Sequence, residues 1–84
     1  MLGAVYFIRE GKTGPVKIGW TAGDVAQRRN NLQTGNSKQL HLLGYIAGVP
    51  KSVETEWHLR FRDLHMRAEW FLPSRPLINA INQS

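Results

Sequence analysis

Two polar, titratable side chains lie in stretches of sequence that are otherwise suited to burial: the phenol of Tyr6 and the amine of Lys17. Residues 4–8 read Ala-Val-Tyr-Phe-Ile, and residues 16–20 read Val-Lys-Ile-Gly-Trp. Both groups titrate well above neutral pH when unperturbed, and burial or a neighbouring charge can bring either into a useful range. Each is therefore a candidate for a chemical role.

Two adjacent arginines lie on or beside the apolar stripe of a helix predicted over residues 25–34. Val25 and Leu32 are seven residues apart and define the face that packs on a sheet, and the positions between them on that face are Arg28 and Arg29. One guanidinium is therefore placed at or beside the buried stripe. The alternative is that both arginines turn outward and cover apolar surface with their stems.

A second predicted helix, over residues 51–66, carries titratable groups along one flank. Glu54, His58, Arg62 and His65 follow one another at spacings of four, four and three beside an apolar stripe. Such a row resembles the wall of a site, and Glu54 is its main candidate. The alternative, which we favour for the histidines from periodicity alone, is a polar boundary strip. The outer face of this helix alternates acids and bases four residues apart, as is typical of a solvated, salt-bridged surface.

Together these positions provide one phenol, one amine, one or two inward arginines and one carboxylate. Hydrolysis of a phosphodiester needs a general base for water, positive charge for the developing phosphorane, and usually a divalent metal ion on a carboxylate. The inventory fits that chemistry. The sequence contains no Ser-His-Asp set, no P-loop and no dinucleotide-binding glycine motif.

Hydrophobic periodicity and turn residues predict the elements that position these groups. They are two strands at residues 4–9 and 16–20 joined by a Gly and Pro turn, a helix at 25–34 between Asp24 and Gly35, a strand at 39–46, the helix at 51–66, an extended segment at 69–71, and a short helix at 74–81. The order β-β-α-β-α-α predicts an α+β fold.

Length, charge and composition limit the classes of function. The 84 residues suit one small domain with a single core. The absence of cysteine excludes disulfides, thiolate zinc sites and thiol nucleophiles, so we expect a reducing, cytoplasmic setting. A net charge of +5 favours a polyanionic partner such as nucleic acid. No apolar run approaches the roughly 18 residues that span a bilayer, so we expect no membrane segment.

Five short segments, in order and at suitable spacing, resemble the signature of the GIY-YIG nuclease superfamily. They are Val-Tyr-Phe-Ile at 5–8, Val-Lys-Ile-Gly at 16–19, Arg28 ahead of Leu-Gln-Thr-Gly at 32–35, Glu54 ahead of His58 and Phe61, and Glu-Trp-Phe at 69–71. The resemblance spans residues 4–72. Within the superfamily, the sequence most resembles the branch found in phage open reading frames and in a fungal meiotically up-regulated gene product. In that branch KIG replaces YIG.

This resemblance implies a fold, a reaction and a set of roles. The fold is a three-stranded antiparallel sheet flanked by helices, with residues 1–84 as a single nuclease domain. The reaction is hydrolysis of DNA phosphodiester bonds with one divalent ion, Mg²⁺ or Mn²⁺. By resemblance, Tyr6 is the general base, Arg28 stabilises the phosphate, and Glu54 holds the metal ion. Lys17 replaces the second tyrosine of the signature, where it would lower the pKa of Tyr6 or contact phosphate.

Other expectations concern His58 and the residues that would contact DNA. His58 matches a recurrent histidine of the branch, and we place it with the catalytic residues. Arg29, Lys38 and Arg62 are expected to contact DNA through its phosphates. A domain this short has little room for sequence readout, so a homodimer or a larger multidomain partner would supply specificity.

The alternative is a catalytically inactive DNA-binding or protein-interaction module on the same fold. It stays open because Asn79 and Asn82 do not convincingly match the C-terminal asparagine motif of the wider superfamily.

Overall fold

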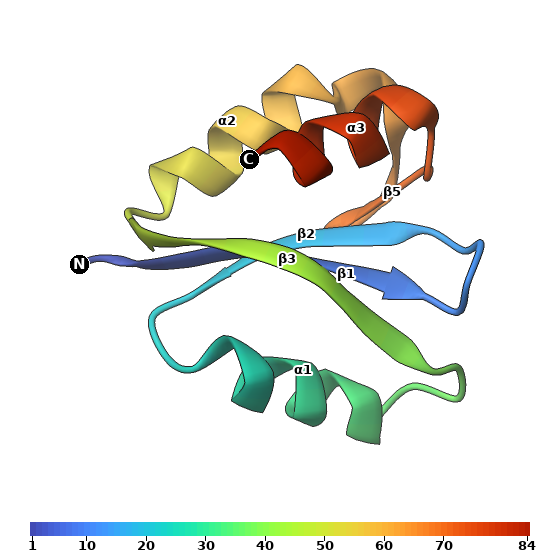
Figure 1. The fold of residues 1–84 in the computed structure, drawn as a ribbon, viewed down its shortest axis with the longest axis horizontal. Coiled ribbons are helices and arrows are strands. Elements are labelled where there is room, and N and C mark those ends of the chain that lie inside the picture. The colour runs from blue at the N-terminus through green and yellow to red at the C-terminus, as the bar shows by residue number, and fades with distance from the viewer.

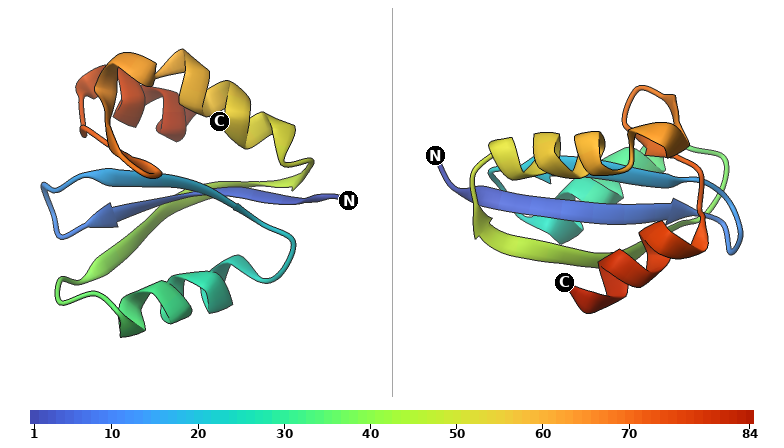
Figure 2. Two further views of the ribbon diagram at one scale, coloured as in Figure 1. Left: turned by 180° about the vertical axis from the view of Figure 1, so that it is seen from behind. Right: turned by 90° about the horizontal axis from the view of Figure 1, so that it is seen from above.

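The computed structural model describes all of residues 1–84 and arranges them in three layers, with a sheet between helices (Figure 1). The strands are β1 (Gly3–Glu10), β2 (Val16–Thr21), β3 (Leu40–Val49), β4 (His65–Arg67) and β5 (Trp70–Phe71). The helices are α1 (Val25–Thr34), α2 (Ser52–Arg60) and α3 (Arg75–Gln83), with a 3₁₀ turn, η1 (Arg62–Leu64), after α2. Helix α1 covers one face of the sheet, and α2 and α3 cover the other (Figures 1 and 2). None of the helices combines the length and the apolar character needed to cross a membrane.

The predicted α+β class and the antiparallel sheet are confirmed, but the sheet has five strands and not three. Its strand order is β3-β1-β2-β5-β4, and every neighbouring pair is antiparallel. The two additional strands form a short hairpin that pairs with the beginning of β2 through Val16 and Lys17. Every residue of β4 is exposed. Periodicity could not detect β4 because such a strand lacks the alternation of buried and exposed positions.

The helix predicted over residues 51–66 is also corrected, because α2 ends at Arg60. The Phe61 N–H still bonds to the Trp57 carbonyl, but the Leu64 N–H bonds to the Phe61 carbonyl in the tighter turn η1. The spacing of three residues between Phe61 and Leu64 suits a 3₁₀ turn as well as an α-helix, so the apolar pattern did not distinguish the two. The ion pairs expected along the outer face of a longer helix do not form.

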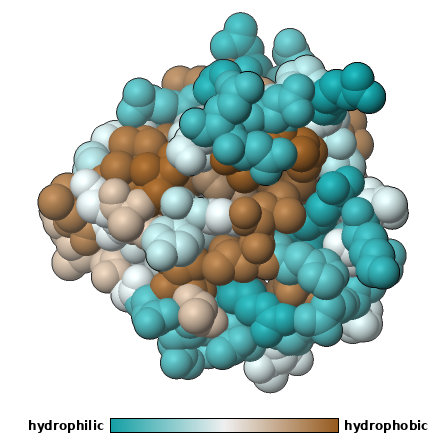
Figure 3. All heavy atoms as spheres, in the orientation of Figure 1, coloured by the Kyte–Doolittle hydropathy of each residue, from teal (hydrophilic) through white to brown (hydrophobic).

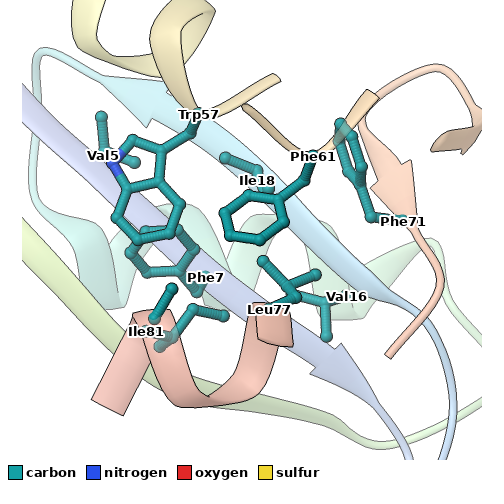
Figure 4. Packing of buried hydrophobic residues seen from close by; sticks show 10 residues of the cluster. Val5, Phe7, Val16, Ile18, Trp57, Phe61, Phe71, Leu77 and Ile81 are labelled. Carbon is teal, nitrogen blue, oxygen red and sulfur yellow. The ribbon is translucent and has the colours of Figure 1, made fainter. Parts of the chain in front are cut away.

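The main hydrophobic core lies between the sheet and the helices α2 and α3 (Figure 4). Phe7 of β1 meets Trp57 of α2 with ring centroids 4.6 Å apart, and Phe61 stacks beside Trp57 at 5.8 Å. Leu77 and Ile81 of α3 close the cluster from the other side. Fully burying side chains of this size contributes roughly 1.5–3 kcal/mol each, so this layer fixes where α2 lies against β2.

The opposite face of the sheet has a smaller core made of Tyr6, Ile8 and Leu40, with residues of α1 packed against it. Strand β3 is an edge strand, and three of its large side chains, Leu42, Leu43 and Tyr45, are exposed. Figure 3 shows hydrophobic side chains gathered across the middle of this view, with hydrophilic ones above and below. The face of the sheet that carries Tyr6 therefore has a smaller apolar core than the face covered by α2 and α3.

Candidate active site

The candidate site lies where the edge of β2 is no longer paired with β5. Strand β5 pairs only with Val16 and Lys17, and beyond them two other groups take up the edge of β2. The Ile18 N–H donates to the Glu69 carbonyl at 2.9 Å, and the Ile18 carbonyl accepts from His58 Nε2 at 2.9 Å. A side chain of α2 therefore contacts the edge of β2 at this point. Side chains from α1 on one face of the sheet and α2 on the other can meet here.

A polar cavity of about 260 Å³ occupies this position. It is bounded by a phenol, an indole, a leucine, three cationic groups and two carboxylates: Tyr6, Trp20, Leu32, Lys17, Arg28, Lys51, Glu54 and Glu69. Four of these were selected from the sequence, namely Tyr6, Lys17, Arg28 and Glu54. The structure brings those four together from β1, β2, α1 and α2.

Tyr6 is held by its strand neighbours. Gly19 is the residue paired with Tyr6 on β2, and the tyrosine ring occupies the space that a side chain at position 19 would fill. Tyr6 is only 2% exposed, yet it borders the cavity. Burial raises the pKa of Tyr6 to about 12; the positive charge of Arg28 opposes this shift, and Glu69 and Glu54 reinforce it.

The resemblance gave Lys17 two possible tasks, lowering the pKa of Tyr6 or contacting phosphate, and its contacts within the chain are with Glu69 and Trp70. Lys17 pairs with Ile8, which lies two residues after Tyr6 on β1 and therefore on the same face. Tyr6 and Lys17 thus share a face of the sheet. The Lys17 amine, however, forms an ion pair with Glu69 Oε1 at 2.9 Å and lies 5.6 Å from the ring centroid of Trp70. The cation that lowers the pKa of Tyr6 is Arg28, and the net shift is upward.

The two adjacent arginines of α1 have different surroundings. The guanidinium of Arg29 donates from Nε and Nη2 to the Leu40 carbonyl, at 3.2 and 2.9 Å, and also to Gln33 and Asn30. Arg28 is exposed, borders the cavity, and makes no side-chain hydrogen bond or ion pair within the chain. Arg28 therefore has free donors for a ligand, whereas Arg29 ties α1 to the start of β3.

Glu54 is the buried acid of the site, with 6% of its surface exposed. Its Oε2 atom is fully buried and receives no hydrogen bond. Burial, together with the neighbouring Glu69, raises the pKa of Glu54 to about 7. Burial also acts on Glu69, but hydrogen bonds from Lys17 and Glu54 outweigh it and hold the pKa of Glu69 below its usual value. The pKa values of the two carboxyl groups therefore shift in opposite directions.

The T5orf172 domain matches residues 3–83, which is almost the whole chain. The chain belongs to the T5orf172 domain family. This is a phage-type domain related to GIY-YIG-like and HNH-like nucleases. Searches of curated proteins and of solved structures found no match to the chain.

His58 of this T5orf172 domain faces β2 and is not among the residues that border the cavity. Because a carbonyl can only accept, the bond to Ile18 requires a proton on Nε2. The edge of the ring also packs on Phe71, with centroids 4.9 Å apart. In this arrangement His58 fixes α2 to β2 and β5.

Three basic residues expected to bind DNA lie outside the cavity. Lys38 is exposed in the loop between α1 and β3, and Arg62 is exposed in η1. Arg29 uses its donors within the chain, as described above. The basic groups that do border the cavity are Lys17, Arg28 and Lys51.

Glu69, Lys51 and Trp20 were not selected from the sequence, and the T5orf172 domain places all three at the cavity. A signal for Glu69 was present. A lysine in an apolar strand needs an anionic partner, and Glu69 begins the segment Glu-Trp-Phe, whose aromatic residues favour a strand. Lys51 and Trp20 carried no comparable signal.

The carboxylates at the cavity suit a divalent cation that is held by few protein ligands. The domain has no group of three His, Asp or Glu side chains that would enclose a metal ion. Mg²⁺ keeps several waters and is commonly held by only one or two carboxylates together with substrate phosphates. A buried carboxylate oxygen without a donor, as in Glu54, fits such an ion.

Proposed function

We propose that this T5orf172 domain is a metal-dependent endonuclease that hydrolyses DNA phosphodiester bonds. The proposal rests on the meeting of Tyr6, Arg28 and Glu54 at one cavity. A general base, a cation for the phosphate and a carboxylate for a metal ion are the parts that this hydrolysis needs. The net charge of +5 and the three cationic side chains at the cavity favour DNA as the partner.

Each residue has a defined task in this proposal. Arg28 binds the scissile phosphate, because its guanidinium donors are free. The Tyr6 phenol releases its proton to solvent through the cavity that it borders, and the resulting phenolate, which Arg28 favours, accepts a proton from the attacking water. Glu54 holds one Mg²⁺ or Mn²⁺ ion, which when bound supplies positive charge against the phosphate. His58 acts by positioning α2, and Lys17 keeps Glu69 at the cavity.

Nicking of supercoiled plasmid tests the proposal. We expect cleavage with Mg²⁺ or Mn²⁺, none with a chelator, and losses of roughly 10²-fold or more in Tyr6→Phe, Arg28→Ala and Glu54→Gln. Matched controls are Tyr45→Phe and Glu56→Gln, because both side chains are exposed and neither borders this cavity. Equal nicking by the parent and the three site variants would contradict the proposal.

The second candidate is a DNA-binding module without catalysis. Two observations favour it: Tyr6 with a pKa of about 12 is protonated at neutral pH, and Asn79 and Asn82 are exposed on α3 away from the cavity. Plasmid binding that weakens steeply with salt, without nicking at any divalent ion concentration, would establish this function instead. In either case, a homodimer or a multidomain partner would be the source of sequence preference.

A further inference from the structure

The side chains of Glu54 and Glu69 both border the cavity, and each carboxyl group shifts the pKa of the other. They come from different elements, α2 and the turn between β4 and β5. Two carboxylates this close repel when both are ionised, so they must share either a proton or a cation. Keeping two ionised carboxylates at one cavity is energetically unfavourable unless a positive group neutralises them.

The cationic side chains of the cavity do not complete the pair. Lys17 contacts Glu69 Oε1, and Glu54 Oε2 receives no donor although it is fully buried. A buried acceptor without a hydrogen-bond partner is destabilising, and more so when it is charged. Of the groups that border the cavity, Glu54 is therefore the one at which a small cation would be stabilised most.

Glu69 is held in a fixed position for such a role. Its backbone carbonyl accepts from the Ile18 N–H at 2.9 Å, and its side chain is held by Lys17. The preceding residue, Ala68, has a φ of +47°, a conformation that is unfavourable for alanine. His65 Nε2 donates to the Ala68 carbonyl at 2.7 Å and supports that turn. A carboxylate anchored at its backbone and side chain is preorganised as a ligand.

We propose that Glu69 is a second protein ligand of the divalent cation, so that Glu54 and Glu69 hold one ion between them. The inference rests on the metal-dependent part of the proposed function and adds a ligand to it. The competing interpretation is that Glu69 serves only to position Lys17 through their ion pair. The two interpretations differ in what Mn²⁺ does on the protein without DNA.

Mn²⁺ binding to the DNA-free domain tests the proposal, by line broadening in amide NMR spectra and by the signal of free Mn²⁺ in electron paramagnetic resonance. We expect broadening confined to residues around Glu54, Glu69 and the end of β2. Glu69→Gln should weaken Mn²⁺ binding about tenfold or more, comparably to Glu54→Gln. The matched control Glu56→Gln removes an exposed acid from α2 and should leave the affinity unchanged. The same spectra show whether each variant is folded.

Two further variants separate ligation from positioning. Glu69→Asp keeps the charge but shortens the side chain, so it should also weaken Mn²⁺ binding. Lys17→Met removes the ion pair and a competing positive charge, while the backbone of Glu69 stays bonded to Ile18, so Mn²⁺ binding should persist. Under the competing interpretation, Glu69→Gln leaves Mn²⁺ affinity at the level of Glu56→Gln, and that result would overturn the proposal.

The experiment distinguishes failure of this inference from failure of the proposed function. Plasmid nicking that depends on Glu54, combined with normal Mn²⁺ affinity in Glu69→Gln, would remove the second ligand and leave the nuclease proposal intact. Mn²⁺ binding that requires both acids, without any nicking, would support the paired site and contradict the nuclease. Absence of site-specific broadening in the parent protein would overturn the paired site.

Discussion

The ring of Tyr6 lies across Gly19, the residue paired with it on the neighbouring strand. A Cβ atom at position 19 would overlap the phenol carbon and oxygen and lie 2.8 Å from Cε1 of the ring. The glycine of the Lys-Ile-Gly segment is thus required by the tyrosine of the preceding strand. Any side chain at position 19 must move the group proposed as the base.

Gly19→Ala is expected to displace the phenol. Overpacking of this kind costs roughly 1–3 kcal/mol of unfolding free energy. A misplacement of the reacting group by about 1 Å costs roughly 10²-fold in nicking rate. Gly44→Ala is the matched control, because this glycine also lies in a strand but has open space where its Cβ would be. Urea unfolding and plasmid nicking on both variants check the prediction, which fails if the two alanine variants behave alike.

Arg28→Ala and Arg29→Ala should have opposite effects. Arg28 makes no contact that supports the fold, so its loss should change the unfolding free energy by less than about 0.5 kcal/mol and reduce nicking by roughly 10²–10³-fold. Arg29→Ala removes donors from the Leu40 carbonyl, so it should lower the unfolding free energy by about 1–3 kcal/mol. Comparable stability of the two variants would contradict this assignment.

The rate of nicking should rise with pH if Tyr6 is the base. Because its pKa is about 12, only a small fraction of Tyr6 is phenolate at neutral pH, and that fraction grows about tenfold per pH unit below the pKa. We expect the single-turnover rate to follow this slope from neutral to mildly alkaline pH. Tyr6→Phe should lose both the activity and the slope. A parent profile that is flat over the same range would assign the base to another group.

Stability of the metal-free protein should fall as pH rises. Folding raises the pKa of Glu54 from 4.5 to about 7, so between these values the folded state binds more protons than the unfolded state. The stabilisation is complete below about 4.5 and is lost as pH rises through about 7. Urea unfolding in a chelator should show this decline in the parent and a smaller one in Glu54→Gln. The lowered pKa of Glu69 acts below this window. Parallel curves for the two proteins would contradict the prediction.

Much of the fold followed from short-range sequence signals. Asp24 caps α1 as predicted by accepting from the Gln27 N–H, and α1 and α3 lie within a few residues of the predicted ranges. The extended segment predicted at residues 69–71 contains β5, but β4 escaped prediction because its three exposed residues carry no alternation.

The site was predicted where a polar residue interrupted an apolar pattern, as Tyr6, Lys17 and Glu54 do. Glu69 was missed because its role depends on the residue that it contacts. The strand pairing that places Glu69 beside Lys17 joins positions far apart in sequence. Periodicity also could not decide between Arg28 and Arg29. Arg29 is the arginine held within the chain because its guanidinium donates to the Leu40 carbonyl, which lies outside the helix.

The cavity draws on five separate parts of the chain, and the last of them, the turn that carries Glu69, follows α2 in sequence. A chain emerging from the ribosome therefore contains Tyr6, Arg28 and Glu54 before it contains the residue that holds Lys17 in place. The polar cavity is therefore complete only when the last strands, β4 and β5, have joined the sheet and brought Glu69 to Lys17.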